Sequence, residues 1–127
     1  MTYLFAFEKL NVWKLAKDFA VELYKITNGF PREERFGLAS QMNRAAVSVA
    51  SNIAEGSSRT SKKDRAHFYQ IAFSSLMEVT SQLVIVKDLG FIDNKEHERL
   101  RLIIYDISNK LNALYKSTFP QFPSSTI

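Results

Sequence analysis

Four polar side chains between residues 44 and 55 have types and a spacing that could do chemistry together. In the segment RAAVSVASNIAEGSSR, residues 44–59, they are Arg44, Ser48, Asn52 and Glu55. Steps of three and four residues place them along one stripe of a helix. A guanidinium, a hydroxyl, an amide and a carboxylate in one stripe could form a connected hydrogen-bond network. Ser75 and Glu78, in a later helical segment, are spaced so that they could meet this stripe across a helix–helix contact.

Two interpretations of this polar stripe follow. In the first, the side chains pair with one another and hold neighbouring helices in register, because buried polar groups must be paired. In the second, the stripe is the site of a metal- or ligand-dependent enzyme. Its working residues would then be Ser48, Asn52, Glu55 and Glu78. The small residues Ala45, Ala46 and Ala50 favour the first interpretation, since they let another helix approach closely.

Other catalytic or metal-binding arrangements are weak in this sequence. The two histidines, His67 and His97, fall near the starts of two successive helical segments, which lie at opposite ends of an antiparallel bundle. The sequence has no cysteine, no phosphate-binding glycine loop and no Gly-x-Ser-x-Gly motif. We therefore predict no catalytic residue, no metal site and no cofactor.

A short basic run follows the polar stripe. In RTSKKDR, residues 59–65, its basic members are Arg59, Lys62, Lys63 and Arg65. Residues 1–65 hold 11 Lys/Arg and 7 Asp/Glu, so the first half of the chain carries the whole formal net charge of +4. The run is either a solvated loop or an edge that contacts nucleic-acid phosphates.

Apolar periodicity and helix-terminal residues indicate the elements that position these side chains. Apolar residues recur at steps of three and four in four segments, which predicts helices at about residues 8–28, 32–55, 61–89 and 94–118. Gly29, Gly56 and Gly90 are predicted C-terminal caps, and Asp93 is a predicted N-terminal cap. Short connections favour an all-α, antiparallel up-and-down four-helix bundle of elongated shape. We predict one domain over residues 1–119 and a frayed tail over residues 120–127.

The predicted bundle has more apolar surface than a monomer needs. Outside the main apolar stripes, large apolar side chains recur on the first and third helices. The interface candidates among them are Trp13, Tyr24, Phe73, Met77 and Val84. We predict that these side chains are buried between the subunits of a homo-oligomer. The alternative is that aromatic residues simply widen the face that packs on the core.

Nothing in the sequence predicts a membrane partner. No apolar run approaches the roughly 18 residues needed to cross a bilayer. The N-terminal MTYLFAF is too short for the core of a signal peptide and lacks a basic lead-in. We therefore expect a cytoplasmic protein.

Several segments together resemble a known family. They are FEKLNVWKLA, FPREERFGLASQMNRAAVSVASNIAEGSSR and IAFSSLMEVTSQLVIVKDLGFI. With the four-helix layout, they resemble the bacterial four-helix-bundle proteins encoded in intervening sequences of 23S ribosomal RNA genes. The resemblance covers roughly residues 7–118. Asn43, Ala50 and Phe73 stand where the family often has other residues, and the loss of basic residues weakens the case for nucleic-acid contact through the second helix.

The resemblance implies a left-handed up-and-down bundle that assembles into a ring, typically a homopentamer. The fold is also similar to that of the accessory protein of diversity-generating retroelements, which works with a reverse transcriptase and nucleic acid. The family has no established enzymatic activity, and RNA binding is suspected from its genomic location. We therefore predict a non-enzymatic oligomer that binds RNA or DNA non-specifically through its basic loops. The alternative is a scaffold that recruits another protein and binds no nucleic acid.

Overall fold

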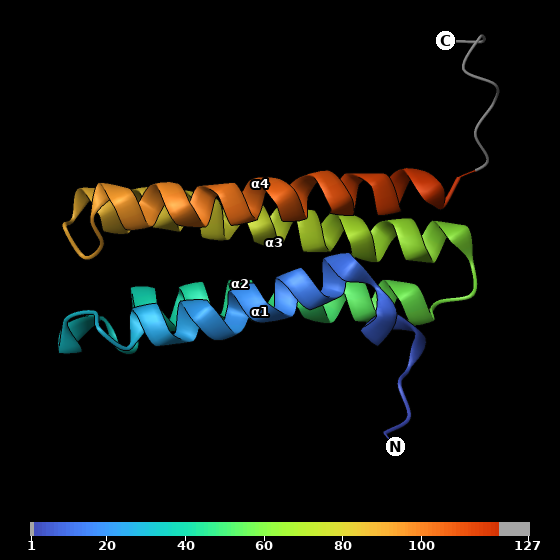
Figure 1. Ribbon diagram of the computed structural model, residues 1–127, viewed down its shortest axis with the longest axis horizontal. Helices are drawn as coiled ribbons and strands as arrows, with labels where there is room; N and C mark the ends of the chain where they lie inside the picture. Colours follow the sequence, from blue (N-terminus) through green and yellow to red (C-terminus); the bar gives the residue numbers. More distant parts are fainter. Residues whose placement is uncertain (1, 120–127) are drawn as a thin grey trace, which may run out of the picture.

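The computed structural model describes residues 2–119, and the regular elements in this part of the chain are all helical (Figure 1). The four α-helices are α1 (Asn11–Thr27), α2 (Leu38–Ser58), α3 (Lys62–Asp88) and α4 (Asn94–Ser117). Two short 3-10 turns, η1 (Ala6–Lys9) and η2 (Arg32–Glu34), precede α1 and α2. The prediction of an all-α chain with four helices is confirmed. The tail predicted at residues 120–127 lies outside the described residues.

The chain runs along the long axis of the molecule four times and reverses at each connection (Figure 1). The α1–α2 and α3–α4 connections lie at one end, on the left of the view, and the α2–α3 connection lies at the other. Each helix packs on its neighbours in the chain, and α4 also contacts α1. The basic run at residues 59–65 is therefore at one end of the molecule, far from the α1–α2 connection.

The core is made by one apolar stripe from each helix. Residues three and four positions apart face the same side of a helix, and the four stripes meet along the axis of the bundle. The most deeply buried large side chains are Phe19, Leu23, Met42, Val49, Ile53, Leu76, Val79, Leu83, Val86, Leu100, Ile107 and Leu111. Burial of each such side chain contributes roughly 1.5–3 kcal/mol. The core is therefore the main source of the stability of the fold.

Two of the predicted helix caps are confirmed. Gly90 has a φ of 81°, the left-handed conformation that favours glycine at the end of a helix. The turn lets Phe91 fold back onto Phe30, with 5.4 Å between the ring centroids. At the start of α4, the Asp93 side chain accepts a hydrogen bond of 2.8 Å from the backbone N–H of Glu96.

The other two predicted caps are wrong. α2 does not end before Gly56 but continues through it to Ser58, and Gly56 is buried inside the bundle. Gly29 is not left-handed, because Gly90 is the only residue with a positive φ in the described part of the chain. The chain leaves α1 through a right-handed turn instead, in which the Gly29 N–H donates to the carbonyl three residues earlier at 3.0 Å.

Two helices begin later than predicted. α2 begins at Leu38 because residues 32–34 form the separate turn η2 and Gly37, with φ −108° and ψ −112°, breaks the helical path. The Glu34 carboxylate accepts a hydrogen bond of 3.4 Å from the Leu38 N–H, a donor at the start of α2. The break leaves the Phe36 side chain 88% exposed. The first helix likewise begins at Asn11, since residues 6–9 form η1.

His97 in the first turn of α4 makes the stability of the bundle dependent on pH. Its side chain is buried, and Nε2 has no hydrogen-bond partner among residues 2–119. Burial lowers the pKa of His97 below 6.5, Lys87 and Arg101 lower it further, and Glu98 and Asp88 oppose them. Just below pH 6.5 the unfolded chain therefore binds more protons at this residue than the folded chain.

We expect the free energy of unfolding to be lower at about pH 5.5 than at about pH 7.5, because the unfolded state gains the extra proton in this range. Urea denaturation at the two pH values measures the difference. A glutamine side chain does not titrate in this range, so His97→Gln should remove most of the difference between the two pH values. An equal pH dependence in the variant and the parent protein would contradict this role of His97.

Candidate functional site

The structure brings together three of the six predicted polar residues. Ser48 Oγ on α2 lies 2.8 Å from Ser75 Oγ on α3. Asn52, one turn later on α2, donates its Nδ2 to Ser48 Oγ at 3.0 Å and to the Ser48 carbonyl at 2.8 Å. All three side chains are half-buried. This serine–asparagine cluster, made of Ser48, Asn52 and Ser75, joins the middle of α2 to the middle of α3.

The three charged residues of the predicted network lie outside this cluster. Glu55 pairs with Arg59, with 3.3 Å between Oε2 and Nη2. Glu78 accepts a hydrogen bond of 3.2 Å from Gln82 Nε2 on its own helix. Arg44 is exposed and makes no hydrogen bond or ion pair within the described part of the chain. The six residues therefore do not form one connected network.

The serine–asparagine cluster is poorly suited to nucleophilic catalysis. A serine nucleophile needs an adjacent base to take its proton, but the groups bonded to the Ser48 hydroxyl are a second hydroxyl and an amide. Over residues 2–119, no group of three or more His, Asp or Glu side chains is arranged to hold a metal ion. The arrangement pairs polar groups where two helices meet.

A contact that the sequence pattern does not predict lies one turn after Asn52. A Cβ atom at Gly56 would lie 2.6 Å from Tyr69 Cε1 and 3.1 Å from Phe68 Cβ, both on α3. Tyr69 is buried, and its hydroxyl lies 3.2 Å from Ser57 Oγ. Gly56 therefore makes room for α3 to approach α2. The only signal for this in the sequence is the row of small residues that Gly56 extends.

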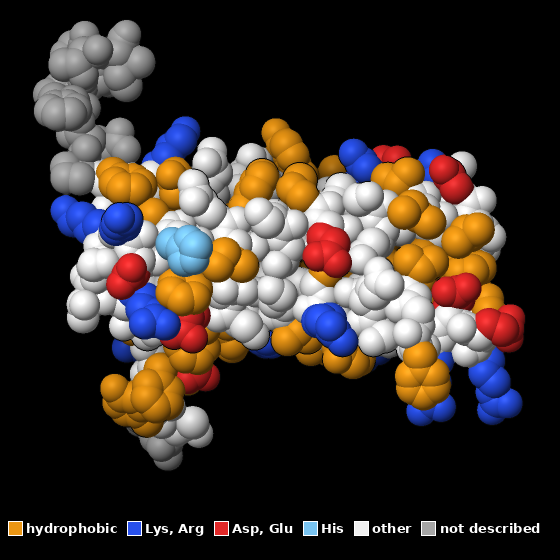
Figure 2. All heavy atoms as spheres, turned by 180° about the vertical axis from the view of Figure 1, so that it is seen from behind, with side chains coloured by type: hydrophobic (Ala, Val, Ile, Leu, Met, Phe, Trp, Pro, Cys, Tyr) orange, Lys and Arg blue, Asp and Glu red, His pale blue; other side chains and the backbone are white. Residues whose placement is uncertain are grey.

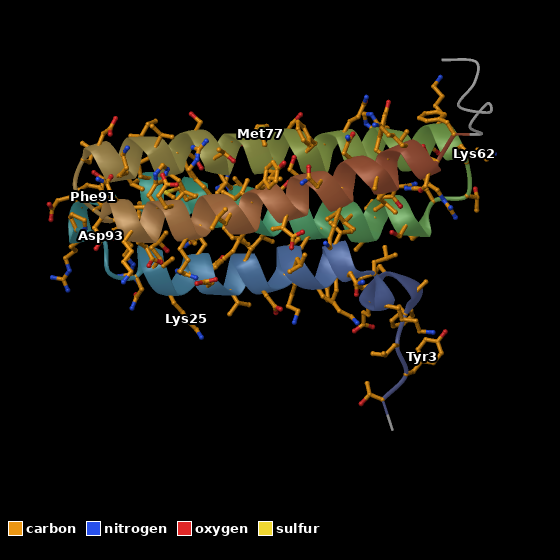
Figure 3. The ribbon with its side chains drawn as sticks, turned by 45° about the horizontal axis from the view of Figure 1, so that its top comes forward. Tyr3, Lys25, Lys62, Met77, Phe91 and Asp93 are labelled. Atoms are coloured by element: carbon orange, nitrogen blue, oxygen red, sulfur yellow. The ribbon has the colours of Figure 1, made fainter. Side chains whose placement is uncertain are left out.

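The basic run lies at the α2–α3 connection, at the end of the bundle where Lys62 is labelled (Figure 3). Arg59 is held in place by its ion pair and by Phe68, whose ring centroid is 4.7 Å from the guanidinium carbon. Arg65 Nε donates a hydrogen bond of 2.7 Å to the Arg59 carbonyl. Lys62 and Lys63 are exposed and have no polar partner among residues 2–119. Two positioned guanidinium groups and two unpaired ammonium groups thus lie close together.

The predicted interface residues lie at least partly on the surface. The exposed fractions are 53% for Tyr24, 39% for Phe73, 38% for Met77 and 36% for Val84. Trp13 is half-buried and, with Tyr24, lines a groove of about 640 Å³ between α1 and α2, which we call the α1–α2 groove. The other three side chains lie on α3, where Met77 is labelled in Figure 3. The predicted interface residues thus lie on two different surfaces of the molecule.

A family model described as 23S rRNA-intervening sequence protein matches residues 8–113, a range that includes α1, α2 and α3 and most of α4. The chain belongs to this family. None of the curated proteins matches this member of the 23S rRNA-intervening sequence protein family. In the range from residue 2 to residue 119, no helix is long and apolar enough to cross a membrane.

A solved structure is similar to this member of the family. It is the crystal structure of a protein of unknown function from the S23 ribosomal protein family of Bacteroides thetaiotaomicron. The TM-score is 0.77 at 22% sequence identity, and the match covers 83% of this chain and 95% of that chain. At this identity the likeness concerns the fold alone.

Proposed function

We propose that this family member is a non-enzymatic protein that binds the phosphate backbone of RNA or DNA. The distribution of charge carries this proposal. When each helix is divided at its midpoint, the half with the α2–α3 connection (residues 2–19, 48–75 and 106–119) holds nine Lys/Arg and five Asp/Glu. The other half holds eight of each. The whole net charge of +4 therefore belongs to the half that carries the basic run (Figure 3).

The basic groups at this end suit phosphate contacts. Lys62 and Lys63 have no ion pair with described residues that a phosphate would have to break. Arg59 and Arg65 are already positioned by neighbouring groups, and a guanidinium can donate two parallel hydrogen bonds to one phosphate. Phosphate contacts carry no direct information about base identity, so we expect little sequence preference.

The proposal includes self-assembly. The α1–α2 groove and the apolar side chains of α3 are different surfaces, and contacts between different surfaces of identical subunits repeat head to tail. Such contacts close into a ring when the rotation between subunits allows it. The family resemblance suggests five subunits, and five chains of +4 would carry +20 in total. Light scattering of the purified protein measures the mass of the assembly and would contradict self-assembly if it gave a monomer.

The salt dependence of RNA affinity tests the proposed binding. We expect fluorescence anisotropy of a labelled single-stranded RNA to show an affinity that falls as salt rises. The expected slope of log affinity against log salt is about −0.7 per phosphate neutralised, or about −3 for four contacts. An affinity that does not change with salt, or no binding at about 50 mM salt, would overturn the proposal.

The α1–α2 groove favours a second function, that of a scaffold that recruits another protein. Its lining is mostly apolar and includes Trp13, Val21 and Val47, and exposed apolar surfaces of this kind mark protein interaction sites. Pull-down from the native host with and without nuclease separates the two functions. Protein partners that stay bound after nuclease treatment favour the scaffold, whereas partners released by nuclease favour nucleic-acid binding.

A further inference from the structure

A cavity of about 920 Å³ lies at the end of the bundle opposite the basic run. It is open to solvent and is lined by the last turn of α1, the turn η2 and the first half of α2, and we call it the turn cavity. Its volume is within the range of small-molecule sites, roughly 300–1,000 Å³. Phe30 forms part of the wall and is fixed by its contact with Phe91, which is labelled at this end in Figure 3.

Three unpaired arginines line the turn cavity. Arg32, Arg35 and Arg44 make no ion pair within the described part of the chain. Among residues 2–119, no Asp or Glu side chain lines the cavity, and the nearby Glu34 carboxylate is directed to the Leu38 N–H. A set of guanidinium groups without carboxylate partners fits the oxygens of a phosphate.

Exposed aromatic rings lie beside these arginines. Phe36 is 88% exposed, Tyr24 is 53% exposed, and both line the turn cavity. The guanidinium carbon of Arg35 is 5.5 Å from the centroid of the Phe36 ring. Figure 2 shows basic and apolar side chains projecting side by side at this end of the molecule, at the lower right. Nucleobases stack on exposed rings of this kind, and a neighbouring arginine adds to the stacking.

A side-chain amide completes the lining. Thr27 Oγ1 lies 3.0 Å from the side-chain amide of Asn43 and 3.2 Å from the Tyr24 carbonyl oxygen. Thr27 and Asn43 both line the turn cavity. Amide groups of this kind recognise the edges of unpaired bases.

We propose that the turn cavity binds a nucleotide. The phosphate is held by Arg32, Arg35 and Arg44, and the base stacks on Phe36. The required chemistry is the same for a free nucleotide and for one nucleotide of a single strand, and the experiment below separates the two sources. Because the turn cavity and the basic run lie at opposite ends of the bundle, this site does not depend on the proposed backbone binding.

Isothermal titration calorimetry with adenosine monophosphate tests the proposal. Adenosine lacks the phosphate and ribose 5-phosphate lacks the base, so each should bind at least about tenfold more weakly. Arg44→Ala and Phe36→Ala should each weaken binding of adenosine monophosphate about tenfold. Both side chains are exposed, so neither change removes a core contact. Arg101→Ala removes an exposed arginine of α4 outside the cavity and should leave the affinity unchanged.

Equal affinities for the Arg44→Ala and Arg101→Ala variants would overturn the proposal, as would equal affinities for adenosine and adenosine monophosphate. A single-stranded oligoadenylate supplies the second arm. If the oligoadenylate binds more tightly than adenosine monophosphate, and Arg44→Ala weakens that binding, the site is assigned to a strand. If the oligoadenylate binds equally or more weakly, the site is assigned to the free nucleotide. Lys62→Glu combined with Lys63→Glu should leave nucleotide binding unchanged, so failure of backbone binding is distinguishable from failure of this site.

Discussion

Replacement of Lys62 and Lys63 by glutamate is expected to lower the affinity for single-stranded RNA roughly a hundredfold at about 50 mM salt. Each lysine–phosphate contact releases counterions from the strand. At this salt concentration, the release from one contact raises the affinity roughly eightfold. Loss of two contacts therefore lowers the affinity for RNA roughly sixtyfold, and the new carboxylates also repel the strand. Anisotropy titration over a range of salt concentrations measures the effect, and the slope should become shallower by about 1.4.

A matched pair of substitutions at the other end of the bundle provides the control. Lys95 and Arg101 on α4 are exposed, have no ion pair within residues 2–119 and belong to the half with no net charge. Lys95→Glu combined with Arg101→Glu changes the net charge by the same amount and should retain most of the RNA affinity. Equal losses in the two double variants would show that binding follows total charge rather than the basic run.

Gly56→Ala is expected to destabilise the bundle by about 2 kcal/mol, although alanine is the better helix former by about 1 kcal/mol. The added Cβ would lie 2.6 Å from the Tyr69 ring and 3.1 Å from Phe68 Cβ. The ring is buried, and moving it away would break its contact with Ser57. Forced overpacking costs about 1–3 kcal/mol and the lost hydrogen bond about 1 kcal/mol. Thermal unfolding should show a Tm lower by roughly 6 °C.

Gly29→Ala is the matched control for this substitution. A Cβ at Gly29 would meet nothing closer than the Ile26 carbonyl oxygen at 3.5 Å, and its φ is not positive. We therefore expect a change within about 0.5 kcal/mol. If Gly56→Ala raised the stability instead, helix propensity would outweigh packing at this position, and the proposed close approach of α2 and α3 would be wrong.

The number of helices and two of their caps are predictable because they depend on local patterns. An apolar residue at every third or fourth position is a property of one segment, and Gly90 and Asp93 act on residues next to them in the chain. The start of α2 is harder to predict. Pro31 and the acids after it are typical of a helix start, but here they open the short turn η2.

The role of Gly56 is not predictable in this way, because its partner lies on another helix. A glycine at the end of an apolar stripe is typical of a helix cap, and no local feature distinguishes it from a glycine that makes room for Tyr69. The partners of the polar stripe are unpredictable for the same reason. Spacing shows that Ser48 and Glu55 share one side of α2, but not that Glu55 pairs with Arg59 while Ser48 turns to Ser75.

The unequal halves of the bundle give the molecule an electric dipole along its long axis. Near a polyanion, such a molecule rotates until its positive end points at the strand, before any contact forms. In the proposed backbone binding, the α2–α3 connection would therefore meet the strand first. In that orientation the turn cavity faces the solution and stays open to a small ligand. The two ends of the bundle thus differ in role: the end with the α2–α3 connection faces a polyanion, and the end with the turn cavity faces away from it.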